Sequence, residues 1–348
     1  MGLQVQDAAV GGDANNAATP KATTMTAVVQ SKYGAAQDVL ELREIDKPVI
    51  KDDDVLVRVH AAGVNVADSI IMRGVPYLVR MVYGLRQPRN SIRGTDVAGT
   101  VEAVGKDVTR LQPGDEVFGW CNGSFAEYVC ASENNFVSKP ANLTFEQAAA
   151  VPMAGMVALQ ALRDVGKVQP GQKVLVNGAS GGIGTFTVQI AKALGANVTG
   201  VCSTRNVDVV RSIGADYVID YTQEDFTQTA EHYDFILDIV ASHSLSDTRR
   251  ALTPNGTLLP NNGTKSMGYM VKANLLSLLS RALPSLVRQK TRTFVSLPKH
   301  EDLIVLRELI ESGQVTPVMD RTYRLSETAD AIGYVEEGHT QGKVVIAV

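Results

Sequence analysis

The sequence has 348 residues, of which 45% are hydrophobic and 20% charged, enough for two globular domains with substantial cores. The net charge of −4 argues against a general nucleic-acid partner, because such proteins carry a basic patch or stripe. Three cysteines, Cys121, Cys130 and Cys202, show no CxxC spacing, which excludes a cysteine-rich structural zinc lobe and favours small buried side chains in a reducing compartment.

Residues 1–24 are rich in alanine, glycine, asparagine, aspartate and threonine. They lack the apolar core of a signal peptide and the arginines of a transit peptide. We therefore expect a disordered lead there and a cytoplasmic location for the protein. No stretch of the sequence is long and apolar enough to predict a bilayer-spanning helix.

Short apolar or alternating runs dominate residues 25–150, and turn formers such as those at Pro113 and Gly114 separate them. Strands are predicted over residues 25–30, 55–61, 99–104, 116–118 and 126–130. Closely spaced short strands of this kind are typical of a small β-rich barrel.

The pattern changes near Phe145, from where helices and strands alternate. Helices are predicted over residues 145–162, 183–194, 207–213 and 244–252, and strands over 173–177, 197–203, 217–220, 235–240 and 256–259. Such alternation indicates βαβ units around a parallel sheet, and hence an α/β fold with a doubly wound Rossmann sheet. Residues 344–348 return to the β-rich character, so we assign 25–150 and 315–348 to the first domain and 151–314 to the second.

A glycine-rich turn lies between a predicted strand and a predicted amphipathic helix, in the run Gly178-Ala179-Ser180-Gly181-Gly182-Ile183-Gly184. Glycines there allow a tight turn and a close backbone approach to a pyrophosphate, while the helix start offers free N–H groups. Because strand and helix stand on both sides, the run predicts a dinucleotide site rather than a structural turn without a ligand.

Residues at the end of the next predicted strand, 197–203, indicate whether NADH or NADPH is bound. NAD-preferring sites commonly carry an acid there for the ribose 2′-hydroxyl, but this chain has Ser203, Thr204 and Arg205 and no acid before Asp208. Two hydroxyls and an arginine suit a 2′-phosphate, so NADPH is the expected cofactor, unless Arg205 is a solvated surface residue.

These residues sit within a wider set of motifs that resembles the medium-chain dehydrogenase/reductases, in their zinc-free quinone oxidoreductase (zeta-crystallin-like) branch. The motifs follow one another from about residue 25 onward, at 62–68, 94–99, 113–117, 123–128, 149–152, 178–184, 214–221 and 342–345. The resemblance implies a GroES-like domain, a Rossmann domain and an active site in the cleft between them.

The resemblance also implies roles for individual residues. Ser180, Gly181, Gly182 and Ile183 would hold the pyrophosphate; Ser203, Arg205 and Tyr221 would surround the 2′-phosphate; Asp238, Ile239 and Val240 would approach the adenine or the nicotinamide riboside; Asn261 and Gly263 would line the nicotinamide end; and Lys343 would close over the cofactor. Tyr221 is equally well interpreted as a core aromatic.

No metal is expected, because the zinc-ligand positions of the family lack ligands here. The first falls at residues 63–65 and has no cysteine, the second is Thr95 in place of histidine, and the third falls near residues 153–156. His60 lies close to the first position, but no metal-binding side chain accompanies it, so a strand residue is the simpler interpretation.

Without a metal, the carbonyl of an acceptor must be polarised by hydrogen-bond donors, which suits quinones, enones and enals. Asn65 is the predicted catalytic donor to the developing enolate oxygen; the alternative is a buried amide that fixes a turn. Two hydroxyls of the family are absent, at Ile70 and Val157. Water, a cofactor hydroxyl or a tyrosine would then supply the proton.

Tyr77, Tyr83 and Tyr269 are candidate proton donors from segments that could line the cleft, and Arg73 is a candidate anchor for an acidic substrate, although an exposed charge is the simpler interpretation. Residues 75–93 and 267–288 combine apolar and basic side chains. We expect them to serve domain packing and a homodimer contact; a mouth for a bulky acceptor and a peripheral membrane surface are alternatives.

Together these observations predict an NADPH-dependent oxidoreductase that transfers hydride to quinones or activated alkenes. A zinc-independent ketone or alcohol oxidoreductase and a non-catalytic NADPH-binding sensor or interaction protein are the alternatives.

Overall fold

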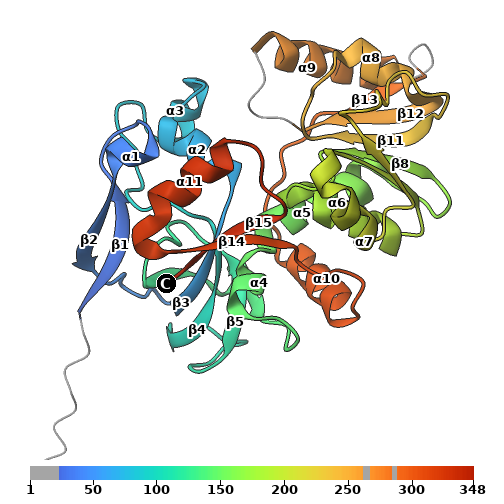
Figure 1. The fold of residues 1–348 in the computed structure, drawn as a ribbon. Coiled ribbons are helices and arrows are strands. Elements are labelled where there is room, and N and C mark those ends of the chain that lie inside the picture. Colours follow the sequence, from blue (N-terminus) through green and yellow to red (C-terminus); the bar gives the residue numbers. More distant parts are fainter. Residues whose placement is uncertain (1–22, 262–266, 284–287) are drawn as a thin grey trace, which may run out of the picture.

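In the computed structural model, which describes residues 23–261, 267–283 and 288–348, the chain forms two domains, each built around a large sheet (Figure 1). Gly263 therefore lies outside the described residues. The C-terminal part of the chain returns from the second domain to the first, where β14 and β15 lie beside the N-terminal strands (Figure 1).

The first domain consists of a large mixed sheet, a separate two-stranded sheet and short helices. Its elements are β1 (Thr24–Gln30), α1 (Ala36–Val39), β2 (Leu40–Asp46), β3 (Asp54–Val64), α2 (Val66–Arg73), α3 (Leu78–Tyr83), β4 (Asp96–Val104), β5 (Glu116–Trp120), β6 (Tyr128–Ser132), β7 (Phe136–Ser138), α4 (Phe145–Ala149), β14 (Met319–Arg324), α11 (Thr328–Glu336) and β15 (Lys343–Ala347). The seven-stranded sheet runs β14-β15-β3-β4-β5-β7 and β6 pairs with β3, while β1 pairs with β2.

Strand β15 completes this sheet from the C-terminal part of the chain. It runs antiparallel to β3, with Val344 opposite Val64, and parallel to β14. Its residues Val344, Val345 and Ile346 are buried, as the apolar run over 344–348 suggests. The pairing places the start of β15 beside the end of β3.

The second domain is a parallel sheet with helices on its faces. Its elements are α5 (Pro152–Gln160), β8 (Lys173–Asn177), α6 (Gly182–Ala193), β9 (Asn197–Cys202), α7 (Val207–Ser212), β10 (Tyr217–Asp220), β11 (Tyr233–Asp238), α8 (Leu245–Arg250), β12 (Leu252–Pro260), α9 (Met267–Ala282), β13 (Lys290–Thr291) and α10 (His300–Glu311). The sheet order is β10-β9-β8-β11-β12-β13, and every neighbouring pair is parallel. The direction of winding reverses between β8 and β11, which is where such sheets bind ligands.

The observed fold differs from the predicted elements most clearly at the helix expected over 145–162 and at strand β2. The single helix expected over 145–162 is divided into α4 and α5, because Pro152 occupies the first turn of α5, where its missing N–H costs nothing. The helix then continues as a π-helical segment, Ala161–Gly166. Strand β2 escaped prediction because most of its residues are exposed and charged, so the alternating pattern is weak.

Candidate functional site

The glycine turn between β8 and α6 has the geometry of an open anion site. Gly178 has a φ of +93°, and a Cβ on Gly184 would lie 2.0 Å from the carbonyl oxygen of Gly178, so only glycine fits there. Gly181 precedes the twelve-residue helix α6, and no side chain caps the helix start. The N–H groups of Gly182 and Ile183 at the helix start are therefore available to an anion, with no capping side chain in competition.

The segment that follows β9 lies beside this turn. The side-chain amide of Asn206 donates a hydrogen bond to Ser180 Oγ at 2.9 Å, which fixes the turn to the Ser203–Arg205 segment. Arg205 is exposed, and its Nη2 donates to the carbonyl oxygen of His339 at 2.7 Å. Arg205 thus stands at the edge of the turn and also holds the loop that leads into β15.

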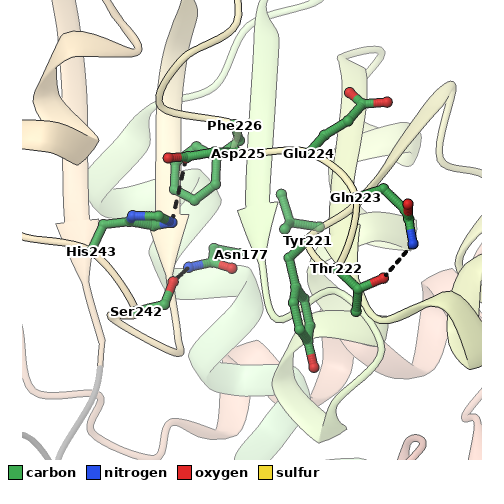
Figure 2. A pocket seen from close by; sticks show the side chains of 10 residues that line it. Asn177, Tyr221, Thr222, Gln223, Glu224, Asp225, Phe226, Ser242 and His243 are labelled. Carbon is green, nitrogen blue, oxygen red and sulfur yellow. Dashed lines mark hydrogen bonds and ion pairs between the residues drawn. The ribbon is translucent and has the colours of Figure 1, made fainter.

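A cavity of about 280 Å³ opens at the carboxyl ends of β8, β9 and β10 (Figure 2). It is lined by Asn177, Val201, Tyr221, Thr222, Gln223, Glu224, Asp225, Phe226, Ser242 and His243. Tyr221 is 59% exposed and lines this cavity, which rules out the interpretation as a core aromatic. The cavity lies where the sheet order reverses, the position expected for the adenosine half of a dinucleotide.

Asp220, at the end of β10, was missed by the sequence analysis. Its carboxylate accepts hydrogen bonds from the Thr222 backbone N–H at 3.0 Å and the Thr222 hydroxyl at 2.8 Å. A hydrogen bond from Thr204 is the main cause of its lowered pKa. An acid at the end of the edge strand β10 carries no distinctive sequence signal, because only the pairing of β10 with β9 brings it beside Thr204.

Asp238 holds the loop that follows β11. It is fully buried, and its Oδ1 accepts hydrogen bonds from Asn177 Nδ2 at 2.7 Å and from the N–H of Ala241 at 2.8 Å. The N–H of Ile239 donates to the Asn177 carbonyl, and a Cβ on Gly178 would lie 2.9 Å from Val240. The carboxylate of Asp238 therefore shapes the loop around Ile239 and Val240. The N–H of Asn261 donates to the Asp238 carbonyl, so Asn261 lies next to this loop.

Tyr269 points toward Asp238 rather than standing free. Its ring packs against the buried cluster that contains Ile236 and Leu258, and burial together with the neighbouring Asp238 carboxylate raises the pKa of its hydroxyl. A phenol with a raised pKa is a poorer proton donor. The environment of Tyr269 thus argues against the predicted role.

A buried polar cluster joins the ends of β3, β4 and β15. Lys343 Nζ donates hydrogen bonds to Asn65 Oδ1 at 2.6 Å and to the Val64 carbonyl at 3.2 Å, and lies 3.4 Å from Asp96 Oδ2. Asn65 Nδ2 donates to Asp96 Oδ2 at 3.0 Å and lies 3.4 Å from Thr95 Oγ1. Burial raises the pKa of Asp96, and the Lys343 ammonium opposes this shift.

Asp68 is a second buried acid at this cluster. Its Oδ2 accepts a hydrogen bond from the N–H of Asn65 at 2.8 Å, which caps the start of α2. Burial raises its pKa to about 7, opposed by the hydrogen bond from Asn65 and reinforced by the charge of Asp96. The spacing from Asn65 to Asp68 matches a helix cap, but its full burial could not be read from the sequence.

The loop before β15 connects this cluster to the glycine turn. The N–H of Gly342 donates to the Ser180 carbonyl at 2.8 Å, and the next residue is Lys343. A Cβ on Gly182 would lie 3.0 Å from Lys343 Cδ. The side chain of Lys343 thus crosses the glycine turn and ends at Asn65, in the first domain. The resemblance implied that Lys343 closes over the cofactor; in this structure its ammonium is turned into the cluster.

Comparisons with known proteins agree with this architecture. Residues 51–141 match the alcohol dehydrogenase GroES-like domain, and residues 213–346 match the zinc-binding dehydrogenase family. The Mus musculus protein named NAD(P)H oxidoreductase RTN4IP1, mitochondrial, is 33% identical over 361 residues, covering 94% of this chain and 90% of the relative. The Arabidopsis thaliana protein named NADPH-dependent alkenal/one oxidoreductase, chloroplastic, is 33% identical over 346 residues, with coverage of 95% and 81%.

Among solved structures, the quinone oxidoreductase from Coxiella burnetii superposes with a TM-score of 0.79 and 27% identity, covering 93% of this chain and 99% of that one. The chain is a medium-chain dehydrogenase/reductase of the quinone oxidoreductase branch. This dehydrogenase/reductase accordingly has a GroES-like domain and a Rossmann domain, and it is an oxidoreductase that uses NAD(P)H.

The zinc-ligand positions of the family carry other side chains in this dehydrogenase/reductase. The first two positions hold Asn65 and Thr95, which contact each other, and the N–H of Met153, near the third, donates to Asp96 Oδ1 at 3.0 Å. Within residues 23–261, 267–283 and 288–348, no three histidine, cysteine or acidic side chains gather as a metal site. His60 is a strand residue, stacked on Phe145 at 4.3 Å and bonded to Thr100.

The remaining predicted residues lie apart from the Asn65 cluster or are already engaged. Tyr77 is 73% exposed, and its ring lies beneath the Arg80 guanidinium. Tyr83 is also exposed. Arg73 forms a two-pronged ion pair with Glu336, with both contacts at 2.6 Å, so its charge is already matched. Arg73 is therefore not free to anchor an acidic substrate, and neither Tyr77 nor Tyr83 occupies an enclosed position.

Proposed function

We propose that this protein is an NADPH-dependent reductase of quinones and activated alkenes that acts without a metal. The observation that carries the proposal is the link made by two consecutive residues. The N–H of Gly342 donates to the Ser180 carbonyl in the glycine turn, and the ammonium of Lys343 donates to Asn65 Oδ1. A dinucleotide on the turn would therefore have its reactive end near the polar cluster. When bound, NADPH supplies the hydride.

The residues that would hold the cofactor fit a dinucleotide with a 2′-phosphate. Ser180, Gly181, Gly182 and Ile183 form the uncapped start of α6, and the cavity beside Tyr221 would take the adenosine. Ser203 and Arg205 lie beside the turn, and the Arg205 guanidinium retains donors beyond the one given to His339. The negative charge of Asp220 would repel a 2′-phosphate. Its carboxylate already accepts hydrogen bonds from Thr222, however, so we favour NADPH over NADH.

Asn65 is the group we assign to the acceptor. One amide hydrogen goes to Asp96, while the contact to Thr95 is 3.4 Å, long for a hydrogen bond, so the second hydrogen can turn toward a developing enolate oxygen. The Lys343 ammonium polarises the amide by donating to its oxygen. With Tyr269 beside Asp238, we assign protonation of the enolate to water.

The names of the relatives support the acceptor class, because they include quinone oxidoreductases and an alkenal/one oxidoreductase. We also propose a homodimer, a cytoplasmic location and a membrane contact. The three free thiols, Cys121, Cys130 and Cys202, suit a reducing compartment. Light scattering would test the dimer, and cell fractionation would test the location.

An acceptor screen tests the function directly. Oxidation of NADPH and NADH would be followed with a panel of quinones, enones, enals and simple ketones, with and without a chelator. We expect turnover of quinones or enones with NADPH and no effect of the chelator. Good reduction of ketones with inert enones would establish the ketone reductase instead. Loss of turnover on chelation, restored by zinc, would overturn the metal-free assignment.

A further inference from the structure

Helix α9 carries apolar side chains on its outward side as well as on the side that packs on the sheet, where Tyr269, Ala273 and Leu276 lie. Val271, Leu275, Leu278 and Leu279 are 58%, 55%, 63% and 40% exposed, and they form one stripe at helical spacing. We call these four residues the α9 face. Figure 1 shows α9 at the outer edge of the second domain. Neither this face nor the exposed apolar residues of α3 serve the packing within the chain that the sequence suggested.

The inward side of α9 is held by polar contacts in addition to its apolar packing. Ser277 and Ser280 are buried, and Ser280 Oγ donates to the Thr291 carbonyl at 2.9 Å. The N–H of Thr293 donates to Ser277 Oγ at 3.3 Å. Hydrogen bonds to β13 and the residues after it thus fix which side of the helix faces inward. The outward position of the leucines is therefore set by the fold.

Charge is distributed unevenly around this helix. Residues 248–300 contain nine lysines and arginines and no aspartate or glutamate, in a chain whose net charge is −4. Lys272 and Arg281 lie on α9 and are exposed, and no ion pair joins either to a described acid. Burial, together with the nearby charge of Arg281, lowers the pKa of Arg292. The exposed leucines thus share their helix with two exposed cations, Lys272 and Arg281, that no described acid neutralises.

We propose that the α9 face binds the surface of an anionic lipid bilayer. Its aliphatic side chains would enter the boundary between headgroups and acyl chains, while Lys272 and Arg281 contact lipid phosphates. The contact is peripheral, since none of the described helices is long and apolar enough to cross a bilayer. A second segment also combines positive charge with exposed apolar side chains. Residues 69–95 contain five arginines and no acid, and Leu78, Met81 and Val82 of α3 are exposed.

The same observations weigh against other occupants. A two-fold contact between copies through α9 would bring the same lysines and arginines together without any acid to balance them. A nucleic acid would match the charge, but the phosphates of a duplex offer little to exposed aliphatic side chains, and a single strand is bound through aromatic stacking, which the α9 face lacks. Only an anionic bilayer satisfies both the charge and the apolar stripe.

Vesicle sedimentation tests the proposal with the full-length protein. Vesicles of phosphatidylcholine alone would be compared with vesicles that contain about 40% phosphatidylglycerol. Both would be used at the same particle number, at about 0.1 M and about 0.5 M salt. We expect binding to the anionic vesicles, at least fivefold less binding to neutral ones, and a marked loss at high salt. Equal binding to both vesicles, or binding to neither, overturns the proposal.

Paired variants locate the contact. Leu275→Ser/Leu278→Ser and Lys272→Glu/Arg281→Glu should each lower the bound fraction at least fivefold, with unchanged melting temperature and quinone reduction. The matched controls Leu42→Ser/Val49→Ser and Lys51→Glu/Lys106→Glu change exposed residues of the first domain and should bind like the wild type. If the leucine variant instead converts a dimer to a monomer while vesicle binding persists, the α9 face is a subunit interface and the proposal is wrong. Vesicle sedimentation does not depend on turnover, so its outcome tests the membrane contact independently of the proposed function.

Discussion

Lys343 Nζ lies 2.6 Å from Asn65 Oδ1, so the start of β15 is tied to the residue that follows β3. The same ammonium lies 3.4 Å from Asp96, which is fully buried. Lys343, Asn65 and Asp96 contact one another, so the loss of one removes two contacts, and the loss of Lys343 leaves the buried Asp96 without its cation. This arrangement makes the cluster both a link between segments and a sensitive site for mutation.

Replacement of Lys343 by methionine should destabilise the protein by about 3–5 kcal/mol, because Asp96 would remain buried without its cation. Urea unfolding measures the loss. The double variant Lys343→Met/Asp96→Asn should recover most of it, since the uncompensated charge is gone. Equal stability of Lys343→Met and the wild type would show that the ion pair makes no net contribution.

Replacement of Arg205 by glutamate should raise the KM for NADPH roughly ten- to a hundredfold, the loss expected for a hydrogen bond to a charged group. The KM for NADH should change much less. Steady-state kinetics with both cofactors measure this, with Arg211→Glu on α7 as the matched control for an exposed charge. Equal losses for both cofactors would refute the 2′-phosphate assignment.

Two glycines of the turn should respond in opposite ways. Gly184→Ala should lower stability by about 1–3 kcal/mol or more, because its Cβ would meet the Gly178 carbonyl at 2.0 Å. Gly181→Ala has open space around its Cβ and should fold normally, yet bind the dinucleotide more weakly. Thermal melts and cofactor titration separate the two. Unchanged cofactor affinity in Gly181→Ala would place the pyrophosphate elsewhere.

Asp68 should make stability depend on pH. Because its folded pKa is raised from 3.8 to about 7, the folded state keeps a proton that the unfolded chain has lost, so stability falls as pH rises from about 4 to about 7 and levels off above. Asp68→Asn removes this loss and should be more stable by about 4 kcal/mol at most at pH 8, with no gain near pH 4. Melts across this range test it; a gain that is the same at every pH would contradict the assignment.

Substitutions of Tyr269 and Asn65 should have different effects on kcat. Tyr269→Phe should keep kcat within about twofold, because its hydroxyl faces Asp238 and its pKa is raised. Asn65→Ala should lower kcat by about a hundredfold, as expected on loss of a donor to a developing oxyanion. Single-turnover reduction of a quinone measures both. A large kcat loss in Tyr269→Phe would restore it as the proton donor.

Much of the second domain could be predicted from sequence because its strands are short buried runs between helices. The predicted ranges for β8 and β10 agree with the structure, and the glycine turn was found from its spacing. The exposed strand β2 and the divided helix at Pro152 were missed, since solvent exposure and helix breaks weaken the periodic signal that such predictions use.

The site was harder to predict than the fold, because its contacts join distant segments. The resemblance located Asn65 and Lys343 separately, but the bond between them follows from the pairing of β15 with β3. The tyrosine candidates were chosen by segment, and a sequence does not reveal that Tyr77 lies exposed while Tyr269 turns to Asp238. Side-chain direction depends on packing, which no local pattern encodes.

The position of β15 in the first sheet also has a consequence for biosynthesis. Strand β3 can pair with β4 and, over Asp54–Arg58, with β6 early, but its edge over Ala61–Val64 stays open until β15 arrives, with Val64 and Lys343 separated by 279 positions. The Rossmann strands are all made in between. On the ribosome, the second domain can therefore fold while the first still exposes an unpaired edge, the situation in which chaperones protect nascent chains from misassociation.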